Sequence, residues 1–418
     1  MNNMDRDFLK GKNSTSSVRI NNLVFSYFIT AFLLCYALLT WLPQYTPETF
    51  KPAIFSMPLS KLSMDFDAVV VSAKRLHQGK SPRLLNLPAE RDVYPYPIGG
   101  AIHSYGGLTI IAMYPFKNIA FQSLRLAWLF ITIAIVVWLC HKVLLETELY
   151  DHNKKYRSLI LLAFSSLILI LSGPINLLIE RGQIEIIIPF LLYFIWRDYR
   201  QDNVSFKTSF LLGLAIHIKE WPLLLVVLFF SRKNFRYFIA AGLTPLVLSL
   251  LLNPILPIQE QIKSTELYAH AASQMTGWIN VSLFSLLSVL KFQLRWKFVT
   301  ALWLVASALL LLYMQHKTRS LTSVSRRDQL FAYTVLVSLL APGFMCDYCL
   351  VTLLLLLPMI GQLRISVIGA SILAILQNNL LFFGYYAGGI KAALMLFLIS
   401  SIIYELLKTN THLLHNKP

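Results

Sequence analysis

Two carboxylates, Asp65 and Asp67, follow the first long apolar run of the chain and stand close to its end at Trp41-Leu42-Pro43. A carboxylate beside a membrane can act as a general base that removes the proton of a hydroxyl group. Residues two apart on a helix do not share a face, so only one of the two is the base, and Asp65 is our candidate. Aspartate is also a favoured N-cap residue, and this structural role is the alternative for both.

Cationic side chains recur at the polar breaks between later apolar runs, at Arg181, His217, Lys219 and His270. Charged groups inside a membrane protein are costly and commonly line functional cavities. For His217 and Lys219, snorkelling at a helix end is the structural alternative. Cations of this kind can neutralise the charge that develops on a departing phosphate.

A carboxylate base combined with phosphate-binding cations suits displacement at a sugar carbon whose leaving group is a lipid phosphate. Phosphate is already a good leaving group, so this reaction needs no second carboxyl as general acid, whereas a glycosidase uses two. It demands no metal ion and no other cofactor, and a divalent ion near Asp65 or Asp67 is the alternative.

Other chemistry has no support in the sequence. The chain lacks the glycine-rich phosphate-binding motifs of nucleotide-dependent enzymes, the nucleophile elbow of hydrolases and the H-E-x-x-H zinc motif. Its net charge of +17 comes from 37 basic and 20 acidic residues. The basic residues cluster in short loops between apolar runs, as in cytoplasmic loops of membrane proteins, so we expect no nucleic-acid partner.

The elements that must position these residues are membrane helices. Of the 418 residues, 56% are hydrophobic and only 14% are charged. Long apolar runs without strand alternation predict an all-α polytopic membrane protein of about 12 transmembrane helices. We expect a single domain over 1–418 with cytoplasmic termini at 1–21 and 408–418. Residues 43–118, with juxtamembrane helices, and residues 253–297 would form the two long extracytoplasmic loops.

Several apolar segments are ambiguous. Residues 98–116 are interrupted by glycines and Pro115, and residues 282–292 are amphipathic, so each predicts either a juxtamembrane helix or a span. The runs around 180–185 and 217–222 have arms shorter than the roughly 20 residues of a full span. Their polar tips lie either within a water-filled cavity or at the kink of a broken span.

A family resemblance accompanies these patterns. The run Asp65-Phe66, Ala73, Leu76, Gly79 and Tyr94-Pro95 is similar to the first external loop of the DUF2029 (GT87) membrane glycosyltransferases. Further similarities follow in the same order along the chain, at Gly182-Gln183, Lys219, Asn280-x-Ser282 and Ala341-Pro342. The resemblance implies a GT-C-type helix bundle and a polyprenyl-phosphate sugar donor, commonly of mannose.

The resemblance also implies roles for particular residues. Asp65 is the expected base, whereas Asp67 falls at a variable position. The expected substrate-binding residues are Asp67, Arg181, Gln183, His217, Lys219, His270, Asn280 and Asp347. Asp347 departs from the family, which often has a histidine there near the donor phosphate. An acid would repel phosphate, so a different donor or acceptor is one explanation and a local misalignment is the other.

Together these observations predict an inverting hexosyltransferase of a bacterial cytoplasmic (inner) membrane, with its active site on the periplasmic side. Its partners would be the polyprenyl-phosphate sugar, a glycolipid or glycan acceptor of the cell envelope, and membrane lipids. A transporter or flippase of a lipid-linked sugar would have a similar cationic cavity. An envelope glycan polymerase or ligase is a third possibility and would take its sugar from a lipid diphosphate.

Overall fold

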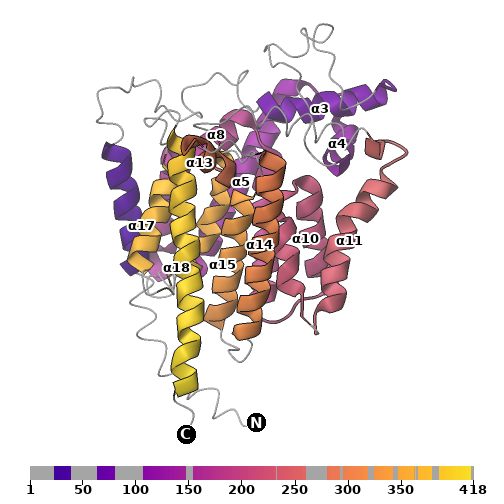
Figure 1. Ribbon diagram of the computed structural model, residues 1–418. Coiled ribbons are helices and arrows are strands. Elements are labelled where there is room, and N and C mark those ends of the chain that lie inside the picture. Colours follow the sequence, from indigo (N-terminus) through magenta and orange to yellow (C-terminus); the bar gives the residue numbers. More distant parts are fainter. Residues whose placement is uncertain are drawn as a thin grey trace, which may run out of the picture.

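The computed structural model describes most of the chain as a bundle of helices (Figure 1). No strand occurs among the residues that it describes. The described residues are 23–38, 64–80, 107–146, 154–231, 233–259, 280–291, 295–318, 324–341, 347–361, 363, 366–378 and 386–415.

Three described helices are long and apolar enough to cross a membrane. They are α5 (Phe121–Glu146), α14 (Trp296–Lys317) and α18 (Ala387–His415). A fourth candidate is the pair α7 (Arg157–Leu171) and α8 (Gly173–Arg181), which is bent by 70° at the break between them. The helices thus support a membrane protein, while the expected total of about 12 spans remains a prediction.

Shorter apolar helices make up much of the remaining bundle. A helix of 13 residues is about 20 Å long, which is less than the roughly 30 Å hydrocarbon layer, so each covers only part of a bilayer. They include Leu23–Leu38, α9 (Ile187–Arg200), α10 (Phe206–Ile218), η6 (Trp221–Phe229), α11 (Phe235–Leu251), α15 (Val324–Leu340), η7 (Asp347–Leu356), α16 (Leu357–Ile360) and α17 (Ser366–Leu376).

The centre of the bundle is α15, in which every residue from Leu330 to Leu340 is buried. It packs against α9, η6, α14 and α18. In contrast, α11 and α14 expose apolar side chains such as Leu246, Leu251, Val305 and Leu309. Exposed apolar surface of this extent is unfavourable in water and natural in lipid, so α11 and α14 have the character of lipid-facing helices.

One end of the bundle carries short helices that lie across it (Figure 1). These are α3 (Met64–His77), α4 (Gly107–Met113), α8 and α13 (Leu283–Val289). We call it the α3 end; the C-terminal end of α18 lies at the opposite end. With seven residues each, α4 and α13 are about 10 Å long. Neither of these described helices is long enough to span a membrane by itself, and the juxtamembrane alternative for the two segments stays a prediction.

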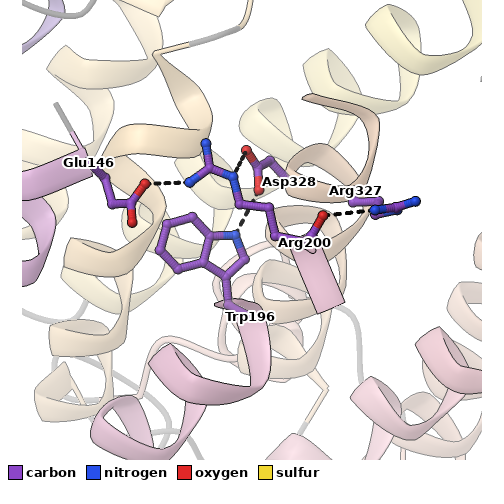
Figure 2. A network of polar contacts seen from close by, with 5 residues as sticks. All are labelled: Glu146, Trp196, Arg200, Arg327 and Asp328. Atoms are coloured by element: carbon purple, nitrogen blue, oxygen red, sulfur yellow. Dashed lines mark hydrogen bonds and ion pairs between the residues drawn. The ribbon is translucent and has the colours of Figure 1, made fainter. Parts of the chain in front are cut away.

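An ionic network ties three helices together at the opposite end (Figure 2). Arg200 of α9 forms an ion pair with Glu146 of α5 and a second one, of 3.3 Å, with Asp328 of α15. Asp328 is completely buried, and its other carboxylate oxygen accepts a hydrogen bond of 2.8 Å from the Trp196 indole. Arg327 donates to the backbone carbonyl of Arg200 at 2.9 Å. This network fixes the end of the bundle away from the predicted site.

Candidate active site

Helix α3 carries both candidate carboxylates in its N-terminal part. Asp65 and Asp67 lie within the helical backbone, so neither has the N-cap position that the structural alternative requires; the structure does not describe their side chains. Phe66 between them stacks on Trp128 of α5, with 5.0 Å between the ring centroids. Near the other end of α3, the Lys74 ammonium lies 3.9 Å from the Phe121 ring of α5. These contacts fix α3 across the beginning of α5.

A break in the chain positions the second predicted segment. Ser172 is the N-cap of α8, and Pro174 is the second residue of this helix, where its missing N–H costs nothing. The Ser172 hydroxyl donates to Gln377 at 3.0 Å, and the Gln377 amide donates to the Leu350 carbonyl at 2.8 Å. The bend between α7 and α8 is therefore anchored on two other parts of the bundle, and it lays α8 across the α3 end.

The C-terminus of α8 leads directly into the predicted polar tip. Gly182 caps the helix with φ 66° and ψ 40°, a left-handed conformation that glycine adopts without strain. Arg181 is half-buried at the last position of α8. Gln183 and Glu185 are both buried beyond the glycine, on the short turn that leads into α9.

The third predicted segment is the break between α10 and η6. Lys219 is the C-cap of α10 and has an extended conformation, and Pro222 is the second residue of η6. His217 and Lys219 are both buried, with 7% and 8% of their surface exposed. The backbone N–H of Leu108 in α4 donates to His217 Nε2 at 3.3 Å, so this ring nitrogen is an acceptor and carries no proton.

A buried ion pair joins these two breaks. Lys219 Nζ lies 3.4 Å from Glu185 Oε1. Around it, α4 contacts α10 through His217, α3 packs against α4, and α8 packs against α3. The structure thus brings the Arg181–Glu185 turn, the His217–Lys219 turn and the helix of Asp65 and Asp67 together at one end.

The remaining predicted residues are less directly connected to this cluster. Asn280 is fully buried, and its side-chain oxygen accepts a hydrogen bond of 3.0 Å from the backbone of Ser282. It therefore supports the start of α13, which packs against α18. Asp347 is the first residue of η7, a helix that packs against α8, but its side chain is not described. His270 lies outside the described residues.

Several buried charged residues of the described part of the chain were not assigned a role from the sequence, among them Glu185 and Lys391. Glu185 was recognised only as part of a polar tip, and its partner is 34 residues away in the chain. Lys391 lies near the start of α18 with 1% of its surface exposed. A lysine inside an apolar run is the signal that could have identified the second residue. Within the described part of the chain, no group of three or more His, Cys, Asp or Glu residues could hold a metal ion.

Comparison with known proteins adds one finding. The family model of glycosyltransferase family 87 matches residues 104–352. The match includes Arg181, Gln183, His217 and Lys219, whereas Asp65 precedes it. No curated protein and no solved structure matched the chain. Because the matched region is more than half of the 418 residues, the protein belongs to glycosyltransferase family 87.

Proposed function

We propose that this glycosyltransferase moves a hexose from a polyprenyl-phosphate donor to a glycolipid or glycan of the bacterial cell envelope. Mannose is our first candidate for the hexose. The reaction would take place at the α3 end, on the outer side of the cytoplasmic membrane. The observation that carries the proposal is the buried Lys219 and His217 turn beside the α3–α4 pair, because it puts a cation close to the helix of the candidate base.

The reaction is a single displacement at the anomeric carbon. The acceptor hydroxyl oxygen bonds to that carbon while the bond to the phosphate oxygen breaks, and the configuration inverts. Asp65 takes the hydroxyl proton as general base. Polyprenyl phosphate leaves with the bonding electrons, and Lys219 and Arg181 balance the negative charge that it gains. Asp67 is the competing candidate for the base.

The surroundings of Lys219 suit a lipid-linked donor. Helix η6 starts two residues after Lys219, and both α11 and α14 pack against it. Because α11 and α14 expose apolar side chains along their length, the proposal places the isoprenoid tail on them while its phosphate reaches Lys219. Gln183, Asn280, His270 and Asp347 are proposed to bind the sugar or the acceptor.

The test is transfer by the purified, detergent-solubilised protein. Polyprenyl-phosphate mannose, glucose and galactose, each with a labelled sugar, are incubated separately with envelope lipid extract, and new labelled glycolipids are separated and identified. We expect one monophosphate donor to give a labelled product of inverted anomeric configuration. A product formed only from a lipid diphosphate would instead indicate a polymerase or ligase. The absence of transfer from every monophosphate donor would contradict the proposal.

A further inference from the structure

The ion pair of Glu185 and Lys219 is a feature that the proposed reaction does not by itself explain. The Glu185 side chain is 2% exposed and that of Lys219 is 9% exposed, and the two charged atoms are 3.4 Å apart. Apolar neighbours Ile184 and Ile186 flank Glu185 and are buried as well. A carboxylate has therefore been brought into apolar surroundings next to the proposed phosphate-binding cation.

Stability alone is a weak reason for such a pair. Removing two charges from water costs several kcal/mol per ion, and well-packed apolar residues of similar size are often as stable or more stable. Buried charges in membrane proteins are uncommon and usually serve a function. The two residues also lie on well-defined turns: Glu185 follows the left-handed Gly182, and Lys219 ends α10.

We propose that Glu185 is a positioning residue for Lys219, which keeps the lysine charged and correctly placed until the anionic group of the donor arrives. This inference rests on the proposed function, in which Lys219 binds the donor phosphate. Burial favours the neutral amine of a lysine, and a neutral amine cannot balance the charge of a phosphate. The Glu185 carboxylate opposes that tendency in the empty site, and the donor phosphate shares the ammonium once it is bound.

The consequence is a specific pH dependence of donor binding. Glu185→Gln removes the carboxylate that lies 3.4 Å from the Lys219 ammonium, so the charged form of the lysine loses a stabilising contact. Its ammonium would then lose its proton at a lower pH, and donor affinity would fall at a lower pH than in the wild type. By analogy with other close charge pairs, the midpoint of this alkaline loss should move down by about 1–3 pH units.

The wild type and Glu185→Gln have the same other titratable groups near the ion pair. The two turns and the elements that pack against them (α5, α9, α11 and η7 among them) carry other titratable or permanently charged residues: Arg125, Cys140, His141, Lys142, Glu146, Glu180, Arg181, Tyr193, Arg197, Asp198, Tyr199, Arg200, Lys207, His217, Glu220, Arg236, Tyr237, Asp347, Tyr348 and Cys349. Because these residues are unchanged in Glu185→Gln, a difference between its pH profile and that of the wild type reports on Lys219.

The matched control is Glu220→Gln. Glu220 directly follows Lys219, so the same substitution removes the same charge one residue away, but its side chain is exposed. Donor binding of wild type, Glu185→Gln, Glu185→Asp and Glu220→Gln is measured from pH 6 to pH 10.5 with a labelled polyprenyl-phosphate hexose, and thermal unfolding is recorded in parallel. We expect Glu220→Gln to follow the wild type. Glu185→Asp keeps the charge at a greater distance and should show a smaller shift than Glu185→Gln.

A charge exchange separates positioning from a purely structural pair. The double variant Glu185→Lys/Lys219→Glu preserves the buried ion pair but puts the cation on the other turn. We expect it to recover much of the thermal stability that Glu185→Gln loses and to bind the donor at least tenfold more weakly than the wild type. If Glu185→Gln does not fold, Glu185→Asp still gives the alkaline midpoint and the double variant still gives the donor affinity.

Three results would overturn the inference. The first is an alkaline midpoint that is the same in Glu185→Gln as in the wild type, or in Glu185→Asp where Glu185→Gln does not fold. The second is an exchanged pair that binds the donor as tightly as the wild type does. In both cases the wild type binds the donor and the proposed function stands. If the wild type binds no polyprenyl-phosphate hexose at any pH, the proposed function fails and this inference fails with it.

Discussion

The chemistry of the proposed site depends on a few side chains held in unusual places. Lys219 and Glu185 are charged and buried, and His217 uses an unprotonated ring nitrogen to hold α4. The residue types at these breaks were predictable because charged groups interrupt apolar runs only at a cost. The pairing of Glu185 with Lys219 was not, because it depends on how two separate turns pack.

Gly182 tests how far the position of Glu185 depends on the turn before it. Gly182→Ala places a Cβ on a residue with φ 66° and should destabilise the protein by about 1–2 kcal/mol. It should also lower transfer activity, because Gln183 and Glu185 lie within three residues after Gly182 and depend on its conformation. Thermal unfolding and initial rates measure the two effects. Gly242→Ala in α11 is the control: a Cβ there has open space, so alanine should leave activity unchanged and stability equal or slightly higher. Equal effects of both substitutions would contradict this account.

At the scale of elements, broken helices place the polar turns and continuous helices support them. The breaks at Ser172-Gly173-Pro174 and at Lys219-Glu220-Trp221-Pro222 could be read from the sequence, since proline favours the start of a new helix. The 70° bend at the first break could not, because Gln377 and Leu350, far away in the chain, hold it. The short lengths of α4 and α13 likewise depend on packing that periodicity does not reveal.

The network opposite the site should be a main support of the bundle. Asp328→Ala leaves the half-buried Arg200 without one partner and the Trp196 indole without its acceptor (Figure 2). We expect a loss of about 3 kcal/mol in the free energy of unfolding, measured in detergent by chemical denaturation. Lys233→Ala removes an ammonium that is 70% exposed and pairs with Asp202. It should cost less than about 1 kcal/mol. A loss for Asp328→Ala as small as that for Lys233→Ala would show that the network is not a support.

At the scale of the whole molecule, the α3 end and the opposite end differ in a way that predicts their sides of the membrane. Basic residues in the terminal turns of α11, α14 and α15, namely Arg236, Lys317 and Arg326, belong to the helix ends that lie opposite the α3 end (Figure 1). Positively charged loops stay in the cytoplasm, so the α3 end should face outward. The sequence predicts the same orientation, which stays a prediction. The number of spans was not decided because many apolar helices are shorter than a bilayer.

Cysteine labelling tests the orientation. Lys80 is exposed just after α3, and Lys233 lies between η6 and α11 with 70% of its side chain exposed. Each is replaced by cysteine in a separate variant. In intact spheroplasts, a membrane-impermeant maleimide should label Lys80→Cys, while Lys233→Cys should react only after lysis; the wild type gives the background. The reverse pattern would place the proposed site in the cytoplasm and contradict the proposed function.

The most direct test of the central claim compares Asp65→Asn with Asp67→Asn in the purified enzyme. Both variants are assayed for binding of the labelled polyprenyl-phosphate hexose and for turnover at saturating donor. The account predicts that Asp65→Asn binds the donor as the wild type does and loses about 10²- to 10⁴-fold in kcat, whereas Asp67→Asn retains most of it. Wild-type turnover in Asp65→Asn would show that this carboxylate does not activate the acceptor hydroxyl.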